Sequence, residues 1–317
     1  MSVKTGLKIF LSLVKNGEFS LILRQFDYYL NVKFLKREKV VRRVNGYPMI
    51  LTFQEDGISK DLMINRQREN VETEVVKKIV KPGMCILDIG ANIGYYTILM
   101  GKLVGDKGRI YAYEPYPSSF DILSRNVQLN NLGGIVEINN LAVSDETTTQ
   151  RLYLGRATNV HTLINYHLDK NNAKHIDVKT VSIREILTRA ERKIDLMRMD
   201  IEGYERKLLS ALDENIDSLL PERIFFEVHP LGNIDPDPTF IEPFKNISGL
   251  GYYPELVISS IAPNAEEKFR SLNYSPSRVV DVGQKKRYLY ENVSSADLLA
   301  VAASRPKMTR AVLLKRR

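Results

Sequence analysis

One segment of the 317-residue chain limits its possible folds more than any other. Residues 84–89 form an apolar run interrupted by a single acid, and Gly90, Asn92 and Gly94 follow it at once. An apolar run that ends in a turn of small residues and continues into a helical pattern indicates a buried strand, a tight turn and a helix start. A second apolar run ends just before Glu114. Rossmann-like sheets place such a turn and such a carboxylate at the carboxyl ends of strands, so the segment predicts an α/β fold with a nucleotide site.

The turn differs from the one that dinucleotide sites use. Those sites have G-x-G-x-x-G directly after the strand, whereas this chain has Asp88-x-Gly90-x-Asn92-x-Gly94. A carboxylate at the strand end would repel a diphosphate, but it suits the ammonium group of a methionine moiety, directly or through water. Asn readily adopts positive φ, so Asn92 is compatible with the turn. The sequence therefore favours S-adenosylmethionine over NAD, and a tight turn that binds no ligand is the alternative.

We expect the cofactor site to combine this turn with the start of the next helix and with acids that follow later strands. Glu114 is expected to accept hydrogen bonds from both ribose hydroxyls. The expected cofactor-binding residues are Asp88, Gly90, Asn92, Gly94, Tyr95, Glu114 and Asp145. Cys85, the single cysteine, lies in the first predicted strand and is expected to be a buried apolar residue rather than a nucleophile or a ligand.

Apolar runs typical of strands alternate with helical stretches through the middle of the chain, which predicts a parallel sheet. Predicted strands cover residues 84–89, 109–113, 135–140, 194–199 and 223–228, and predicted helices cover 94–104, 117–130, 182–190 and 204–212. Residues 257–261 and 286–290 are expected to form a closing antiparallel pair. The stretch 145–180 interrupts the alternation, with a short β excursion near 151–154 and a polar loop over 155–174.

The length allows one α/β domain of about 200 to 230 residues with extensions at both ends. We expect a basic helical extension over residues 1–44 and a small β and helical lead-in over 45–80. The catalytic domain is expected over 81–292, and a basic helix or tail over 293–317.

The net charge of +8 is concentrated at the ends of the chain. Residues 1–43 hold ten Lys or Arg and three acids, and residues 305–317 hold six Lys or Arg and no acid. The ends therefore carry +13 and the remaining residues carry −5. A basic groove through the body is not supported, so no nucleic-acid partner is expected. The basic ends suit contact with an anionic lipid surface or an acidic glycan.

Hydrophobic residues at 44% and charged residues at 26% are ordinary for a globular protein. No apolar run reaches the roughly 18 residues of a membrane span, and no signal-peptide cleavage site follows the apolar start. Leu7, Phe10, Leu11 and Val14 share one helical face, which is typical of a helix that docks on the body, forms a dimer or lies on a membrane surface. We expect a cytoplasmic protein, with peripheral membrane contact and homo-oligomerisation as open alternatives.

A second group of candidates follows the predicted strand at 194–199. Asp200 and Glu202 come directly after this strand, and the next strand leads to His229. Ligands in open α/β sheets bind beyond the carboxyl ends of the strands, so these side chains are expected to face one substrate. Asp200, His229 and Glu202 are therefore the expected catalytic residues. Capping of the following helix is the alternative for the two acids.

Other polar residues are weaker candidates. Glu205 and Arg206 lie inside a predicted helix and are expected to be surface or packing residues. The loop over 155–174 is long enough to be functional. Its polar residues include Asn159, His161 and His167, and its histidines, like His175 beyond it, are weaker candidates than His229.

Together these motifs resemble the FkbM-type S-adenosylmethionine-dependent methyltransferases. The resemblance covers roughly residues 45–229 and rests on four motifs in the order of the family. They are the D-I-G-A-N-I-G-Y-Y-T sequence from Asp88, Glu114-Pro115, the M-D-I-E-G-Y-E sequence from Met199, and the F-E-V-H sequence that ends at His229. One position departs from the pattern: Arg198 stands where the family usually has Lys, and Arg does not readily lose its proton.

The resemblance implies a Rossmann-like class I methyltransferase fold, with a mostly parallel seven-stranded sheet and helices on both faces, over residues 81–292. It also implies O-methylation of hydroxyl groups on sugars, glycans or secondary metabolites, so the expected partner is a small-molecule, glycan or glycolipid acceptor. A hydroxyl acceptor needs a general base, for which Asp200 or His229 is our choice. Mg²⁺ held by Asp200 with Glu202, Glu227 or His229 is the mechanistic alternative.

Three other functions stay open at this point. An N-methyltransferase acting on nucleic acid or protein would share the fold, but the Asn/Asp-Pro-Pro-aromatic motif familiar from such enzymes is absent, and Asp200-Ile-Glu-Gly203 stands in its place. A nicotinamide-dependent oxidoreductase and a binding module without catalytic activity are the others.

Overall fold

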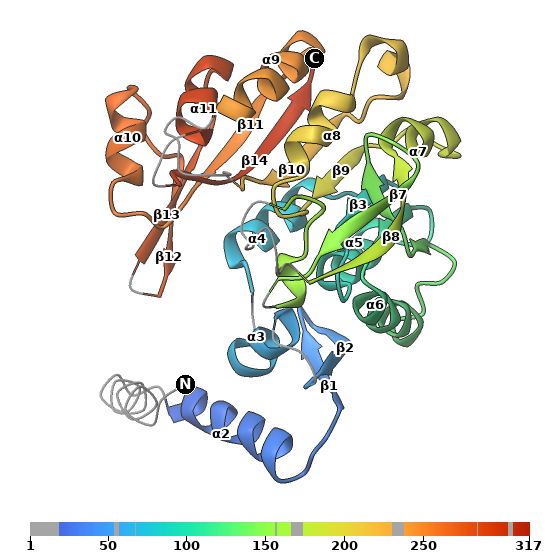
Figure 1. Cartoon of the computed structure of the whole chain (residues 1–317). Helices are drawn as coiled ribbons and strands as arrows, with labels where there is room; N and C mark the ends of the chain where they lie inside the picture. The colour runs from blue at the N-terminus through green and yellow to red at the C-terminus, as the bar shows by residue number, and fades with distance from the viewer. Residues whose placement is uncertain are drawn as a thin grey trace.

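The computed structural model describes residues 19–53, 57–66, 68–155, 157–165, 174–229, 238–283, 285–303 and 307–317. Its main feature is a nine-stranded sheet (Figure 1). In spatial order the strands are β12 (Arg278–Val282), β13 (Lys285–Tyr290), β11 (Tyr252–Ser259), β14 (Thr309–Arg316), β10 (Arg223–Glu227), β9 (Leu196–Met199), β3 (Cys85–Ile89), β4 (Arg109–Tyr113) and β5 (Val136–Asn139).

Five neighbouring strands of this sheet, β10, β9, β3, β4 and β5, run parallel. β14 lies antiparallel between β10 and β11. From β3 the sheet is first extended on one side by β4 and then β5. The chain then returns to the other side of β3 and adds β9 and β10, so the strand order reverses beside β3. This arrangement confirms the predicted Rossmann-like α/β fold and places a topological switch point at the end of β3.

The sheet has two more strands in the described residues than the seven expected. The β12–β13 hairpin adds to the outer edge of β11 and accounts for the difference. The predicted antiparallel pair is confirmed, because Val257 and Ile258 of β11 pair with Tyr290 and Leu289 of β13.

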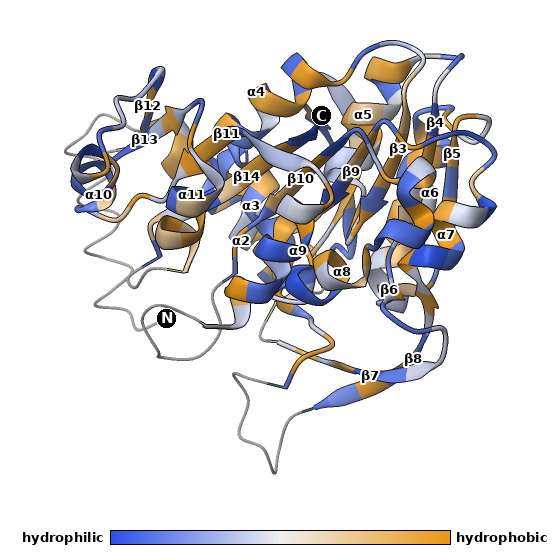
Figure 2. Cartoon of the chain, turned by 90° about the horizontal axis from the view of Figure 1, so that it is seen from above, coloured by the Kyte–Doolittle hydropathy of each residue, from blue (hydrophilic) through white to orange (hydrophobic). Residues whose placement is uncertain are grey.

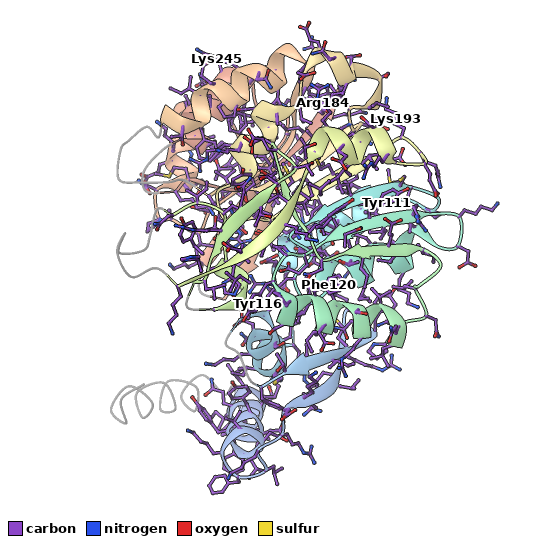
Figure 3. All side chains as sticks on the ribbon, turned by 45° about the vertical axis from the view of Figure 1, so that its right-hand side comes forward. Tyr111, Tyr116, Phe120, Arg184, Lys193 and Lys245 are labelled. Atoms are coloured by element: carbon purple, nitrogen blue, oxygen red, sulfur yellow. The ribbon has the colours of Figure 1, made fainter. Side chains whose placement is uncertain are left out.

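Helices cover both faces of the sheet. α4 (Asn70–Ile79), α5 (Tyr95–Val104) and α6 (Pro117–Leu129) pack on one face, and α7 (Ile183–Arg189), α8 (Glu205–Ala211), α9 (Ile241–Gly249), α10 (Ala265–Ser271) and α11 (Ser295–Ala302) pack on the other. β3 shows how the sheet serves both layers: Cys85, Leu87 and Ile89 belong to one core and Ile86 to the other. Apolar residues therefore line the interior (Figure 2), whereas Arg184, Lys193 and Lys245 lie at the surface (Figure 3).

The predictions for residues 84–140 are confirmed to within one residue at each end. This accuracy has a physical reason, since strands buried on both faces are continuous apolar runs and the glycine-rich turns between them are distinctive. Cys85 is fully buried, and burial raises the pKa of its thiol to about 11, so the expectation of an inert apolar residue is also confirmed.

The end of the chain differs from its prediction. We expected a basic helix or tail after residue 293, and α11 fits this, but Thr309–Arg316 form strand β14 inside the main sheet. Ala311 to Leu314 are four consecutive buried apolar residues, the pattern of a strand covered on both faces. The positive charges that flank them obscured this short run.

The lead-in before the main sheet contains more β structure than predicted. β1 (Lys39–Val44) pairs with β2 (Tyr47–Thr52) across Asn45 and Gly46, which both have positive φ. An Asn-Gly pair between apolar runs is a strong hairpin signal, and the boundary expected at residue 44 falls inside this hairpin. α2 (Phe19–Lys33) precedes it and α3 (Ile58–Asn65) follows it.

The amphipathic face expected over residues 7–14 lies outside the described residues. Among the helices that are described, none combines the length and the apolar character required to cross a bilayer.

A small separate sheet forms where the alternation of strands and helices is interrupted. Its order is β6 (Ala142–Ser144), β8 (His175–Ser182), β7 (Thr149–Tyr153). The β excursion near residues 151–154 is thus confirmed as β7, whereas β8 was not predicted. The connection from β7 to β8 includes the short helix η1 (Thr158–Val160) and passes beside the end of β3.

Candidate functional site

The turn after β3 is held by backbone hydrogen bonds and by residues with positive φ. The N–H groups of Gly90 and Ala91 both donate to the carbonyl of Tyr113, at 3.0 Å each. Gly90, Asn92 and Gly94 have φ of 78°, 49° and 92°. A Cβ on Gly90 would lie 2.2 Å from the carbonyl oxygen of Asp200, so only glycine fits where the two strand ends meet.

Glu114 closes one side of this turn. Its Oε2 accepts a 2.8 Å hydrogen bond from the N–H of Asn92, and its Oε1 accepts one of 2.9 Å from the N–H of Tyr116. The side chain is buried, and burial raises the pKa of the carboxyl group to about 7 against the opposing effect of these two donors. Each carboxylate oxygen has a further lone pair, so Glu114 retains the capacity to accept hydrogen bonds from a ligand.

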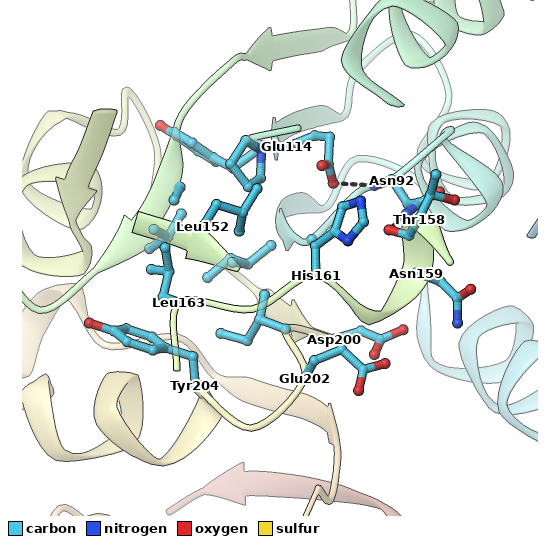
Figure 4. A pocket seen from close by; sticks show the side chains of 17 residues that line it. Asn92, Glu114, Leu152, Thr158, Asn159, His161, Leu163, Asp200, Glu202 and Tyr204 are labelled. Atoms are coloured by element: carbon cyan, nitrogen blue, oxygen red, sulfur yellow. Dashed lines mark hydrogen bonds between the residues drawn. The ribbon is translucent and has the colours of Figure 1, made fainter. Parts of the chain in front are cut away.

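A pocket lies between this turn and the ends of β4 and β9 (Figure 4). Its walls are apolar on one side and polar on the other. The residues that line it are Ile89, Gly90, Asn92, Tyr113, Glu114, Pro115, Ala142, Val143, Leu152, Thr158, Asn159, His161, Leu163, Asp200, Ile201, Glu202 and Tyr204. The pocket thus has apolar side chains in the same lining as the buried carboxyl group of Glu114.

Asp88 does not line this pocket. Its side chain is fully buried, where it accepts a 2.6 Å hydrogen bond from Thr97 and pairs with Arg198 at 3.3 Å. Burial raises the pKa of Asp88, opposed by Arg198 and Thr97. A direct contact with a ligand ammonium group, one form of our expectation, is not available in this geometry because both oxygens face protein groups.

Arg198 connects Asp88, which lies inside β3, with Asp200, which follows β9. Its guanidinium contacts Asp88 and, at 2.8 Å, Asp200, and it lies 4.3 Å from the ring centroid of Tyr96. Burial alone would raise the pKa of Asp200, but the charges of Arg198 and His229 hold it at about 2. Asp200 is therefore a carboxylate at physiological pH and a weak base.

Glu202 stands in the loop between β9 and α8 with an unusual backbone. Its φ is 51° although it has a side chain, and Gly203 follows with φ of 97°. Such strain at a pocket wall is typical of functional loops. Burial raises the pKa of Glu202 to about 7, against the opposing charge of His229. Glu202 therefore exchanges its proton near neutral pH, which suits acid–base chemistry.

His229 lies next to Glu202 but does not line the pocket. Its Nδ1 lies 2.9 Å from Glu205, and its Nε2 lies 3.2 Å from Glu227, 3.6 Å from Glu202 and 4.0 Å from Asp200. Burial disfavours the charged ring, but Glu205 and the other carboxylates raise the pKa of His229 above its usual value. The structure thus brings together Asp200, Glu202 and His229, the three residues expected to be catalytic.

Glu205 was missed by sequence reasoning. We expected a surface or packing residue, yet Glu205 is buried and accepts hydrogen bonds from the N–H groups of Ile201 and Gly203, at 2.9 and 2.8 Å. It also holds the ring of His229. An acid six residues after the end of β9 that accepts from the N–H groups of its own loop is a capping signal that the sequence contained. Arg206 is buried as well and donates to the carbonyl of His229 and to Thr239.

Three further residues expected to bind the cofactor, besides Asp88, lie outside the pocket wall. Gly94 begins α5, where a Cβ would lie 2.9 Å from Leu123, so it is needed for packing. The hydroxyl of Tyr95 donates to the carbonyl of Arg68 at 2.7 Å, beside a smaller hollow that also includes Gly90 and Asp200. Asp145 accepts a 2.7 Å hydrogen bond from Tyr204 and orients this pocket residue from outside.

The loop after β7, which its length marked as a candidate functional loop, contributes one wall of the pocket. Thr158, Asn159 and His161 line the pocket. Asn92 donates to the carbonyl of Thr158 at 3.1 Å, and Thr162 donates to the carbonyl of Glu202 at 3.0 Å. These side chains had no sequence signal beyond the length of the loop. His167 lies outside the described residues.

Asp200, Glu227 and His229 each offer a ligand atom within 4.8 Å of the others, so they have the composition of a metal site. Glu227, however, is already paired with positively charged groups. Lys307 lies 3.0 Å from its Oε1, and Arg310 contacts the same oxygen. Arg198 engages Asp200 in the same way. The negative charge of this cluster is therefore compensated by the chain itself.

A family model described as the methyltransferase FkbM domain matches residues 88–275, more than half of the chain. Two fungal proteins are similar over a shorter stretch. Methyltransferase sdnD of Sordaria araneosa is 27% identical over 157 residues, which are 41% of this chain and 60% of the relative. Methyltransferase 1 of Beauveria bassiana is 26% identical over 161 residues, 43% of this chain and 63% of the relative. The chain thus spans about three fifths of the length of these relatives.

Among solved structures, a SAM-dependent O-methyltransferase from Thermotoga maritima covers 90% of this chain and 81% of its own, with a TM-score of 0.40 and 13% identity. The fold assignment rests on the strand order of the sheet, not on this distant likeness.

Proposed function

The chain belongs to the FkbM methyltransferase family, and from this premise we propose that it is an S-adenosylmethionine-dependent O-methyltransferase acting on a hydroxyl group of a sugar, glycan or secondary metabolite. The observation that carries the proposal is the position of Glu202, a carboxyl group that lines the pocket with Glu114 and lies 3.6 Å from His229, and whose pKa burial raises to about 7.

The residues present fit the cofactor. Glu114 offers carboxylate oxygens to ribose hydroxyls, and Leu152, Leu163 and Tyr204 provide apolar contacts for a purine. When bound, S-adenosylmethionine supplies a methyl group that an oxygen nucleophile attacks at carbon. Asp88 has an indirect role, because its ion pair fixes the position of Arg198 and of the end of β3. The backbone of Gly90 and the side chain of Asn92 complete the wall.

Glu202 is the best of the three candidate bases. Asp200, with a pKa of about 2, has too little affinity for a proton, and His229 does not line the pocket. Glu202 would accept the proton that the acceptor hydroxyl gives up during methyl transfer. His229, 3.6 Å from Glu202, places a positive charge beside the carboxylate that forms when Glu202 loses its proton. This choice differs from our expectation of Asp200 or His229 and follows from pKa and position.

The charges around Asp200 and Glu227 support a reaction without Mg²⁺. Arg198, Lys307 and Arg310 already neutralise these carboxylates, so a divalent cation would have to displace them. A metal-dependent enzyme would lose activity in EDTA and regain it with Mg²⁺. We expect activity to be unchanged by EDTA.

Methyl transfer to a panel of hydroxyl acceptors tests the proposal. Purified protein with methyl-labelled S-adenosylmethionine is expected to label sugars or hydroxylated metabolites and not amine-bearing nucleic acid or peptide. Glu202→Gln is expected to lower kcat by about 100-fold or more while the Kd of S-adenosylhomocysteine changes less than about threefold. The matched control is Glu214→Gln, an exposed acid outside the pocket. Full activity of Glu202→Gln, or labelling confined to amines, would contradict the proposal.

A further inference from the structure

The loop between β7 and β8 contains a buried polar group with incomplete bonding. His161 lies on the wall of the pocket, near Asn92, Thr158 and Glu114 (Figure 4). Its Nδ1 accepts a hydrogen bond of 3.1 Å from the N–H of Gly155. Its Nε2 is buried and has no hydrogen-bond partner within the described residues. Among the described residues that line the pocket, no other side chain has a buried polar atom that lacks a hydrogen-bond partner.

The contact with Gly155 determines which ring nitrogen holds the proton. An N–H group donates only to a nitrogen with a free lone pair, so Nδ1 is unprotonated and Nε2 bears the hydrogen. Burial lowers the pKa of His161 to about 4, so the ring is neutral at physiological pH. Nε2 is therefore an N–H donor, and a buried donor without an acceptor costs free energy.

The ring is held in place before any ligand arrives. It packs edge-on against Tyr116 with 4.5 Å between ring centroids. The next residue, Thr162, exchanges backbone hydrogen bonds with Tyr153 at 2.8 and 3.1 Å. Thr162 also donates to the carbonyl of Glu202. A donor fixed by both neighbouring loops is suited to recognise a ligand at little entropic cost.

We propose that His161 is a nucleoside-recognition residue, whose Nε2–H donates a hydrogen bond to an acceptor atom of the adenosine moiety. The inference rests on the proposed function and adds a binding residue to it. The purine ring and the ribose both offer nitrogen or oxygen acceptors, and the pocket wall shared by His161 and Glu114 is where the nucleoside is expected. His161 is not a base, because the nitrogen near the ligand already holds the proton.

Two substitutions separate the two ring nitrogens. His161→Asn places an amide oxygen near the position of Nδ1, so it keeps an acceptor for Gly155 and removes the Nε2 donor. His161→Gln places an amide nitrogen near the position of Nε2, so it keeps a donor for the ligand and loses the contact with Gly155. His175→Asn, at the exposed start of β8, is the control.

Calorimetry with two probes tests the proposal. The probes are S-adenosylhomocysteine and 5′-methylthioadenosine, which share the nucleoside but not the amino-acid tail. His161→Asn is expected to raise the Kd of both about tenfold, with His161→Gln closer to the unsubstituted protein and His175→Asn unchanged. Thermal unfolding of each variant shows which one has lost the Gly155 contact.

Four outcomes would overturn the assignment. Unchanged affinity of His161→Asn, with S-adenosylhomocysteine still bound by the unsubstituted protein, would remove this inference and leave the proposed function intact. Weaker binding by His161→Gln than by His161→Asn would assign the ring a structural role only. A loss seen with S-adenosylhomocysteine alone would move the contact to the amino-acid tail. Failure of the unsubstituted protein to bind either probe would remove the proposed function as well.

Discussion

Two non-glycine residues of the pocket wall have strained backbone conformations. Asn92 and Glu202 both have positive φ and line the pocket, and Glu69, with φ of 48°, lies beside the neighbouring hollow. For residues other than glycine this conformation costs about 1 kcal/mol or more each. The hydrogen bonds from Asn92 to Glu114 and from Gly203 to Glu205 offset part of that cost. These backbone conformations place the side chains of Asn92 and Glu202 on the wall of the same pocket.

The closest backbone approach at the site is at Gly90. Gly90→Ala would place a Cβ 2.2 Å from the carbonyl oxygen of Asp200, in a conformation that alanine disfavours. We expect a loss of about 3 kcal/mol or more in the free energy of unfolding, measured in urea, together with loss of cofactor binding. Gly133→Ala is the control, since a Cβ there has no neighbour within 4 Å. Equal stability of the two variants would disprove the close approach.

The raised pKa of Glu202 predicts opposite effects on activity and stability. Burial raises this pKa from 4.5 to about 7, so the rate is expected to rise with pH up to about 7 and then level off, a dependence that Glu202→Gln lacks. For stability, the folded state binds the proton more tightly than the unfolded chain. Stability is therefore lost as pH rises from about 4.5 through 7.

Glu202→Gln should consequently stabilise the protein by on the order of 1–3 kcal/mol at pH 8 and have little effect at pH 4. Thermal unfolding at the two pH values measures the difference. A variant that is less stable at pH 8 would contradict this account of the pKa.

At the scale of elements, two connections assemble the site. The loop after β7 is joined to the turn after β3 by the bond from Asn92 to Thr158, and to the loop after β9 by the bond from Thr162 to Glu202. Three segments far apart in the chain thus form one pocket. Each loop on its own exposes backbone groups that need partners, and the other two supply them.

β14 is the element whose removal should be most damaging. It pairs with β10 on one side and β11 on the other, so a chain ending at residue 308 would leave two unpaired strand edges inside the sheet. We expect this truncated protein to be insoluble or unfolded by circular dichroism, and deletion of Arg317 alone to be tolerated. A soluble, cooperatively folded truncation would show that residues 309–316 act as a dispensable tail.

At the scale of the whole molecule, a buried ionic network joins the lead-in to the end of the chain. Glu69 and Glu72 come from the start of α4. Arg310 of β14 lies 3.2 Å from Glu69 and 3.3 Å from Glu72, and Arg287 of β13 also contacts Glu72. Tyr96 donates to Glu69 from α5. The basic residues near the C-terminus are thus partly used inside the protein, which reduces the free positive charge expected there.

Removal of one acid from this network is expected to destabilise the entire fold. Glu72→Ala removes a buried carboxylate from two partly buried guanidinium groups and should cost about 3 kcal/mol of unfolding free energy in urea. Glu74→Ala is the matched control on the same helix, because its exposed pair with Lys77 is worth at most about 1 kcal/mol. Similar losses of unfolding free energy for both variants would show that the network stabilises the fold no more than an exposed ion pair does.

Sequence reasoning was most successful where local signals are strong. Continuous apolar runs, Gly90 and Gly94 specified β3, the turn and α5, and the switch point followed from the alternation. It failed where long-range pairing decides the outcome. The four apolar residues of β14 are too few to stand out, and β8 becomes a strand only because β6 and β7 lie beside it.

The amino-acid sequence by itself determined the class of fold, the family and the set of acids at the strand ends, because these depend on apolar periodicity and on turns that few residues can form. Only the tertiary structure decided which acid has which role. Asp88, Asp200 and Glu202 are similar carboxylates in the sequence, and their differences arise from burial and from neighbours that distant segments supply. Arg198 lowers the proton affinity of Asp200, while desolvation raises that of Glu202. Electric fields and solvent access are properties of the folded chain, so no local pattern encodes them.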